Sequence, residues 1–114
     1  MPLAEDHSDA EYQIKAYSPG RIVINEITYT NNLIISRNQL ITHWNSADIL
    51  ALAALQPEII LIGTGDKSII LKPEILRPLY ELGFSVECMS TQSACHTYTI
   101  LSAENRNVVA GLIL

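Results

Sequence analysis

The stretch Glu58-Ile-Ile-Leu-Ile-Gly63 decides the fold of this chain. It is a continuous apolar run of strand length, which is typical of a strand buried on both faces. The preceding helix is predicted to begin near Ser46, which can cap it, and to stop at Gln56-Pro57. The following helix has Pro73 in its first turn and Gly83 just after its end. A buried strand between two helices predicts a parallel sheet with helices packed on its faces.

The remainder of the second half continues this alternation of strand and helix. Residues 84–89 alternate apolar and polar side chains, which indicates a half-buried or edge strand. A third helix is predicted from about Thr91 to Glu104, with Ser90 or Thr91 as its N-cap, and residues 108–114 form a last strand. The order α-β-α-β-α-β predicts parallel strands joined by right-handed crossovers. Pro78 lies inside the second helix and is expected to kink or shorten it.

The first half carries strand signals instead. Its first strand places Tyr12, Ile14 and Ala16 on one side, and the turn Ser18-Pro19-Gly20 follows. We expect a further hairpin in which Asn31-Asn32 joins residues 27–30 to residues 33–36. Strands linked by short turns predict antiparallel pairing. The predicted class is therefore α/β of mixed α+β character, a single compact domain in which an antiparallel, β-rich half precedes the α-β-α-β-α-β half, with layers of sheet and helices.

The acidic residues are concentrated near the N-terminus, and the rest of the chain is nearly neutral. The chain has 114 residues, with 12 acidic and 7 basic side chains and a formal charge of −5. Residues 1–11 contain four of the acids and no Lys or Arg, so we expect a flexible acidic tail at 1–11 and a single globular domain at 12–114. The remaining 8 acids and 7 bases leave that domain at −1. Its cations are scattered, which argues against a nucleic-acid surface.

Cysteine usage and hydropathy indicate the compartment. Cys88 and Cys95 are too few for a disulfide framework and form no C-x-x-C pair, which indicates reduced thiols. The N-terminus resembles neither a secretory signal nor a mitochondrial transit peptide, and no apolar run reaches the roughly 18 residues that cross a membrane. We therefore expect a cytoplasmic protein with no membrane insertion, no metal site and no cofactor.

The first candidate site is the turn Gly63-Thr64-Gly65-Asp66 at the end of the buried strand. Two glycines permit a tight turn whose successive backbone N–H groups can hold an anion, and ligands of α/β sheets bind at the carboxyl ends of strands. The pattern is not the dinucleotide motif, since Ser68 occupies the position of its third glycine. The other interpretation, which we favour, is a structural turn with unusual φ angles.

The second candidate site is Thr91-Gln-Ser-Ala-Cys-His-Thr-Tyr98, at the start of the third helix. A thiol near a helix N-terminus can act as a nucleophile, with a histidine as its base. Cys95 and His96 are adjacent, however, so on a helix they point about 100° apart and do not face each other. We expect Tyr98 to point inward, Cys95 to be buried on the flank of that stripe and His96 to be exposed, and we predict no catalytic residue.

Four segments carry a family resemblance: Pro57-Glu-Ile-Ile-Leu-Ile-Gly-Thr-Gly-Asp66, Leu82-Gly-Phe-Ser-Val-Glu-Cys-Met-Ser-Thr91, Ala94-Cys-His-Thr-Tyr98 and Val108-Val-Ala-Gly-Leu-Ile-Leu114. Together they resemble a small single-domain family of mostly uncharacterised bacterial and archaeal proteins, which includes the mitochondrial complex I assembly factor 3. The resemblance implies a compact α/β domain, no established enzyme activity and a protein-binding or scaffolding role.

The resemblance also implies a shared surface. Its matching positions here are Gly63, Thr64, Gly65, Cys95, Thr97 and Tyr98. His96 stands where many bacterial members have Arg, which weakens a permanent anion site because His is mostly neutral at pH 7. Ser90 stands where Asp is usual, and it caps a helix about as well.

Two functions from different classes follow. The first is a non-enzymatic domain that binds one or more protein partners as an assembly factor, with the partner unidentified. The alternative is a small-molecule or anion-binding domain, which could also be enzymatic, using the Gly63–Asp66 turn and the N-terminus of the helix near Thr91. It requires those two segments to converge. Sixteen Ile and fourteen Leu in the chain also favour a homo-oligomer, which would bury excess apolar surface.

Overall fold

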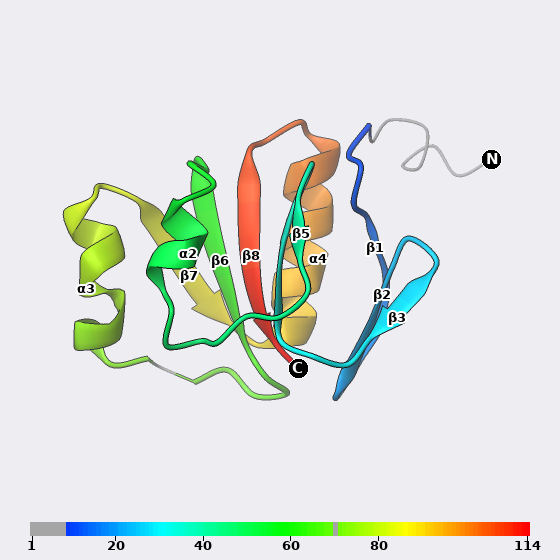
Figure 1. The fold of residues 1–114 in the computed structure, drawn as a ribbon, viewed down its shortest axis with the longest axis horizontal. Helices are drawn as coiled ribbons and strands as arrows, with labels where there is room; N and C mark the ends of the chain where they lie inside the picture. Colours follow the sequence, from blue (N-terminus) through cyan, green and yellow to red (C-terminus); the bar gives the residue numbers. More distant parts are fainter. Residues whose placement is uncertain (1–8, 70) are drawn as a thin grey trace.

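The computed structural model describes residues 9–69 and 71–114, which form two sheets with helices packed on them (Figure 1). The larger sheet has the strand order β5-β4-β8-β6-β7 and the smaller β1-β2-β3. The strands are β1 (Ile14–Ser18), β2 (Arg21–Ile24), β3 (Ile27–Tyr29), β4 (Leu33–Ser36), β5 (Leu40–Ile41), β6 (Ile59–Thr64), β7 (Ser85–Met89) and β8 (Val108–Ile113). The helices are α2 (Leu50–Ala53), α3 (Pro73–Glu81) and α4 (Thr91–Ala103). The predicted mixed α/β class is confirmed.

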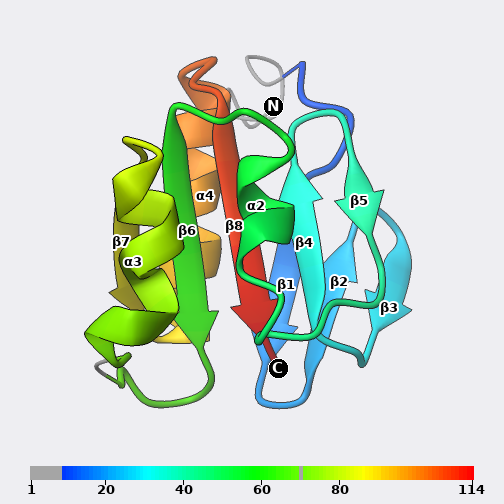
Figure 2. The same cartoon turned by 60° about the vertical axis from the view of Figure 1, so that its left-hand side comes forward.

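The apolar run at residues 59–63 lies in β6, between β8 and β7, and runs parallel to both. Its side chains alternate between two cores, as the two faces of a strand require. Leu61 packs with α4 and the small sheet, whereas Ile60 and Ile62 pack with α2 and α3. Figure 2 shows α2 and α3 in front of the sheet and α4 behind it. The parallel half of the prediction is therefore confirmed, and the sheet is covered on both faces.

β4 does not form the predicted hairpin with β3. β3 pairs instead with β2 across a turn at Asn25-Glu26, where Asn25 has a φ of 55°. β4 pairs with β5 and β8 in the larger sheet. All four residues of β4 are buried, so this strand needs cover on both faces and takes a place inside the larger sheet. The Asn31-Asn32 segment therefore carries the chain from one sheet to the other.

A register shift in β1 changes which of its side chains face inward. The pairing of β1 with β2 slips between Ile14 and Ala16. Ala16 is exposed as a result, while Tyr17 is half-buried and packs on the core that contains Tyr98. An extra residue at a bulge turns the following side chains to the opposite face. The regular alternation predicted for Tyr12, Ile14 and Ala16 is therefore interrupted before Ala16.

α2 is shorter than the predicted helix and begins at Leu50 rather than near Ser46. Hydrogen bonds of a different kind hold the preceding segment. The Asn45 side chain accepts from the backbone N–H two residues further on (2.9 Å), and the Trp44 indole donates to the carbonyl of Asp48 (3.0 Å). These bonds form a turn where the first turn of the helix was expected.

The two longer helices begin where the sequence predicts. Pro73 is the first residue of α3, which continues through Pro78 to Glu81, and Gly83 follows it with a φ of 87°. Ser90 is the N-cap of α4, and its side chain accepts from the backbone N–H of Ser93 at 3.2 Å. Pro73 and Ser90 thus predicted the starts of both helices correctly.

Residues 1–8 of the predicted acidic tail lie outside the described residues. The segment from Asp9 to Glu11, by contrast, contacts the domain. The Arg37 guanidinium pairs with the Asp9 carboxylate, and the Ala10 side chain is buried. The backbone N–H of Glu11 donates to the carbonyl of Arg37 at 2.7 Å. The packed surface of the domain therefore extends to Asp9.

Candidate functional site

The two candidate segments meet where β6 ends and α4 begins. A Cβ atom added to Gly63 would lie 2.8 Å from Thr91 Oγ1 and 2.9 Å from Thr91 Cα. Both distances are shorter than van der Waals contact, so the absence of a side chain at Gly63 lets the helix approach the strand this closely. The convergence that the ligand-binding alternative required is therefore present.

Thr91 connects β6, α4 and β8 through hydrogen bonds. Its backbone N–H donates to the carbonyl of Gly65 at 2.8 Å, and its Oγ1 accepts from the backbone N–H of Gly65, also at 2.8 Å. The same hydroxyl donates to the carbonyl of Ile113 at 2.6 Å. Thr91 is fully buried. We call the set of Gly63, Gly65, Thr91 and Ile113 the Thr91 joint.

Thr64 organises the turn after β6. Its hydroxyl oxygen lies 2.8 Å from the carbonyl oxygen of Lys67 and 3.1 Å from that of Met89, and it accepts from the backbone N–H of Ile69 at 3.1 Å. Gly65 has a φ of 101°, in the left-handed region that favours glycine. The turn therefore has an unusual φ angle, as the structural interpretation predicted, and a side chain fills its interior.

Amides that could hold an anion are used by the protein itself. The N–H groups of Gly65 and Thr91 bond to each other's oxygen atoms within the Thr91 joint, and that of Ser93 bonds to the Ser90 hydroxyl. A helix N-terminus binds an anion through N–H groups that lack a protein partner. These three donors are already paired, which weighs against the anion-binding alternative.

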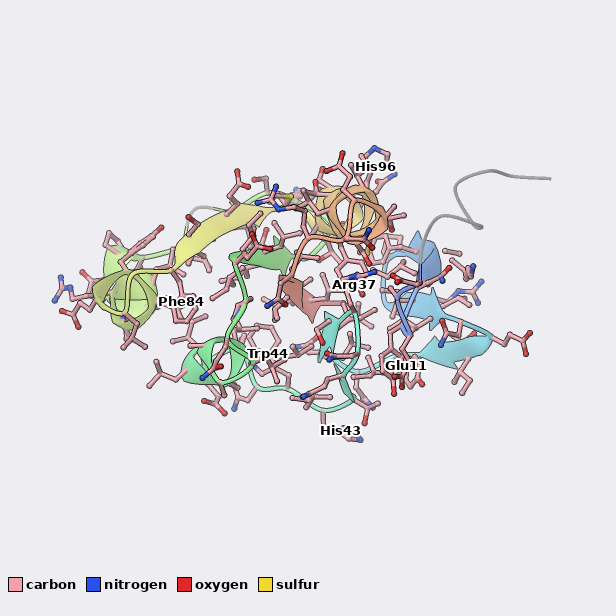
Figure 3. All side chains as sticks on the ribbon, turned by 90° about the horizontal axis from the view of Figure 1, so that it is seen from above. Glu11, Arg37, His43, Trp44, Phe84 and His96 are labelled. Atoms are coloured by element: carbon pink, nitrogen blue, oxygen red, sulfur yellow. The ribbon has the colours of Figure 1, made fainter. Side chains whose placement is uncertain are left out.

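The remaining predicted residues of α4 point to different sides of the helix. Cys95 and Tyr98 are buried, with 6% and 1% of their surfaces exposed. His96 is exposed on the outer side of α4 (Figure 3). Thr97 is half-buried, with its hydroxyl 3.6 Å from the sulfur of Met89. Cys95 and His96 therefore do not face each other, as the helical spacing predicted.

Tyr98 attaches α4 to the start of the domain. Its hydroxyl donates to the backbone carbonyl of Tyr12 at 2.8 Å. Burial raises the pKa of this phenol above its ordinary value, so it stays protonated and keeps its role as a donor. The side chain thus acts as a link between core elements. Asp66, the last residue of the predicted turn, is exposed.

Tyr17 lies near this site, although no sequence pattern pointed to it. Its hydroxyl oxygen is buried, and burial is the main cause that raises the pKa of the phenol, with smaller contributions from Cys95 and Asp66. The residue comes from β1, far from the other members in sequence. Alternation along the strand would have revealed it only if the bulge in β1 had been recognised.

Cys95 is expected to be unreactive in the folded protein. Burial raises the pKa of its thiol to about 12, so the nucleophilic thiolate is almost absent at neutral pH. In a Cys88→Ala variant, where Cys95 is the one remaining thiol, iodoacetamide at neutral pH is expected to leave the native protein unlabelled and to label the chain fully in concentrated guanidinium chloride. Mass spectrometry measures both, and rapid labelling of the native variant would contradict the buried placement.

The same pKa shift fixes how stability changes with pH. The folded thiol binds its proton more tightly than the unfolded one, whose pKa is roughly 8.5. As pH rises from there toward the folded value, the unfolded chain loses the proton first, so the contribution of Cys95 to stability falls.

The described residues provide neither a cluster for a metal nor a membrane span. In the ranges 9–69 and 71–114, no group of three or more His, Cys, Asp or Glu side chains is placed to hold a metal ion. Over the same ranges, no helix is both long and apolar enough to cross a membrane.

Comparisons with known proteins identify relatives along nearly the whole chain. A model of the family described as "Protein of unknown function (DUF498/DUF598)" matches residues 14–113. The chain is 36% identical over 117 residues to the "13 kDa major membrane protein" of Francisella tularensis, covering 95% of each. It is 31% identical over 123 residues to the NADH dehydrogenase (ubiquinone) 1 alpha subcomplex assembly factor 3 of Danio rerio, covering 99% of this chain and 70% of that protein.

A solved structure shows the same arrangement of layers. The Bordetella pertussis protein described as a Mth938-like domain is similar to this chain with a TM-score of 0.78 and 30% sequence identity. The similarity covers 93% of this chain and 87% of that chain. The mixed α/β domain is therefore shared with a protein of determined structure.

Proposed function

This chain belongs to the DUF498/DUF598 family, and on that premise we propose that it is a non-enzymatic, protein-binding domain that assists the assembly of a protein complex. The observation that carries the proposal is the similarity to complex I assembly factor 3 of Danio rerio, which extends over almost all of this chain. Because the similarity covers the domain and not a single motif, its surface is the part of the two proteins expected to act alike.

The geometry of the candidate site supports this proposal over a catalytic one. Thr91 is buried, and its hydroxyl is used twice within the Thr91 joint. Cys95 and Tyr98 lie in the core, and the pKa of the Cys95 thiol is raised, which is the opposite of what a nucleophile needs. We infer that these residues hold β6, α4 and β8 together and do not contact a substrate.

The surface supports contact with protein. Large apolar side chains lie exposed over several elements: Ile27, Ile41, Leu50, Ile69, Ile75, Tyr80, Leu82 and Ile100. Residues 12–114 carry 8 acids and 7 bases, so the net charge of the domain is close to zero. A surface of low charge with exposed apolar groups is typical of protein interfaces and not of sites that attract a charged ligand.

Affinity capture in the native host tests the assembly function. The tagged full chain is expected to enrich a protein partner over a control bait, and deletion of the gene is expected to lower the amount of an assembled respiratory complex on a native gel. If no protein is enriched and the respiratory complexes stay at their normal level, the assembly function is wrong.

The same tagged cells test location. We propose that the protein is cytoplasmic, because Cys88 and Cys95 are both free thiols and the cytoplasm keeps thiols reduced. The name of the Francisella relative refers to a membrane. Recovery of the tagged chain in the cytoplasmic fraction is expected, and its retention in carbonate-washed membranes would contradict the proposal.

A further inference from the structure

β7 ends the larger sheet with an unpaired edge. Among residues 9–69 and 71–114 it pairs with β6 alone, so the outward-facing N–H and C=O groups of its backbone have no described strand beside them. Within the described residues, no turn or loop hydrogen bond reaches the backbone of residues 85–88. This edge therefore presents main-chain donors and acceptors that an added strand can use.

The other sheet edges in the described part of the chain are shorter or covered. β5, at the opposite end of the larger sheet, has two residues, and β3 has three. β1 has five residues, but the segment just before it is held by other parts of the domain, since the Tyr12 carbonyl accepts from the Tyr98 hydroxyl and the Tyr12 N–H donates to the Arg37 carbonyl. β7 also has five residues, a usual length for a strand. β7 is thus the edge best suited to pairing.

A hollow of about 660 Å³ opens beside the first half of β7. Its apolar wall is formed by Ile59, Tyr80, Phe84 and Val86. Figure 3 places Phe84 beside α3, at the end of the molecule opposite Glu11. A strand laid along β7 would direct alternate side chains to opposite faces of the sheet. One of its side chains can therefore enter this hollow while its backbone pairs with β7.

The charges around the hollow favour a cationic partner. Glu58, Glu87 and Arg106 line it. Glu58 Oε2 lies 3.6 Å from Arg106 Nε, so these two charges offset each other. Among the described residues, Glu87 has no cation within 4.0 Å. The middle residue of β7 therefore leaves one uncompensated negative charge at the edge.

We propose that β7 is the docking edge of this domain, where a protein partner adds an extended strand. This inference rests on the proposed protein-binding function, and it identifies the surface of the domain that binds the partner. The partner segment has an apolar side chain that enters the hollow beside Phe84 and a Lys or Arg that lies opposite Glu87. Main-chain hydrogen bonds supply the affinity, and these two side chains supply the specificity.

A titration followed by NMR tests the edge with a defined probe. The probe is a short synthetic peptide in which lysine and valine alternate around a central phenylalanine, added to the 15N-labelled full chain. Shifts of backbone amide signals are expected at Ser85–Met89, because pairing changes the hydrogen bonding there, and at Arg106, because it lines the hollow that the phenylalanine enters. A peptide with glutamate in place of lysine is expected to bind about tenfold more weakly.

Charge-reversal variants separate docking from a general charge effect. Glu87→Lys is expected to weaken binding of the lysine peptide about tenfold and to strengthen binding of the glutamate peptide. Glu74→Lys makes the same change on the exposed surface of α3 and serves as the matched control, with both affinities unchanged. Recovery of the native amide spectrum in each variant shows that its fold is kept.

Three outcomes would overturn the proposal. They are shifts confined to residues outside β7, equal binding of the lysine peptide by Glu87→Lys and the native chain, and self-association of the chain through β7 in sedimentation. Failure of the docking edge and failure of the assembly function can be told apart. A host partner captured equally well by Glu87→Lys refutes the docking edge and leaves the assembly function standing. Peptide binding at β7, with no captured partner and normal levels of the respiratory complexes after gene deletion, refutes the assembly function and leaves the edge standing.

Discussion

Replacing Gly63 with alanine is expected to force the start of α4 away from β6 and to lower the free energy of unfolding by about 2–3 kcal/mol. The new methyl group would lie 2.9 Å from the Cα atom of Thr91 and 3.1 Å from a methyl carbon of Leu112. Rotation of the Thr91 side chain cannot relieve a contact with its backbone, so the helix itself has to move. That movement would lengthen the hydrogen bonds of the Thr91 joint. Urea unfolding followed by circular dichroism measures the loss.

Gly20→Ala is the matched control for this substitution. Gly20 has a φ of 88°, and a Cβ atom there would meet no heavy atom within 4 Å. The control therefore adds backbone strain of about 1 kcal/mol and no clash. If Gly63→Ala destabilises the protein no more than Gly20→Ala does, the close approach of α4 to β6 is not the reason why residue 63 is a glycine.

Thr91→Val is expected to destabilise the protein by about 2–4 kcal/mol while keeping the shape of the side chain. The hydroxyl both accepts from the Gly65 N–H and donates to the Ile113 carbonyl, and valine can do neither. The Gly65 N–H and the Ile113 carbonyl would each lose a hydrogen bond beside a fully buried side chain. Each group left without its partner costs about 1–3 kcal/mol of stability. The free energy of unfolding from urea titration gives the measurement.

Two variants show whether the hydroxyl is the cause. Thr91→Ser keeps the oxygen and is expected to retain most of the stability lost in Thr91→Val. Thr99→Val removes an exposed hydroxyl of the same helix, which donates to the carbonyl of Cys95 at 2.9 Å. That change is expected to stay within about 0.5 kcal/mol. Equal losses in Thr91→Val and Thr99→Val would mean that the joint contributes no special stability.

Local signals predicted the second half of the fold well. The apolar run of β6 indicated burial on both faces, and Pro73, Gly83 and Ser90 marked helix boundaries that the structure confirms. These features depend on residues a few positions apart. They can be read from a sequence because hydrophobic period and capping chemistry are local properties.

Pairing between distant segments could not be read in this way. Asn31-Asn32 looks like a hairpin turn, yet β4 pairs with β8, a strand more than seventy residues later. Only the complete burial of β4 explains that choice, and burial is set by the whole domain. The helix expected from Ser46 failed for a similar reason, since the buried Trp44 bonds to a carbonyl in what would have been its first turn.

The candidate site was predicted in part. The ligand-binding alternative required the Gly63–Asp66 turn to converge with the start of α4, and the structure shows that convergence at Gly65 and Thr91. That the contacts would be internal could not be foreseen, because a threonine hydroxyl serves equally well as a ligand group or as a structural donor. Tyr17 was missed because a bulge is a property of strand pairing and leaves no clear sequence signal.

The position of β8 determines how the domain must fold. It lies between β4 and β6, so the antiparallel and parallel parts of the larger sheet are joined only through this strand. The antiparallel part cannot complete its hydrogen bonding until β4, in the first half of the chain, has met β8 near its end, which requires the closure of a long loop. Pairing between segments this far apart raises the contact order, so folding slower than that of a domain with mainly local contacts is the expected consequence of placing the last strand in the middle of the sheet.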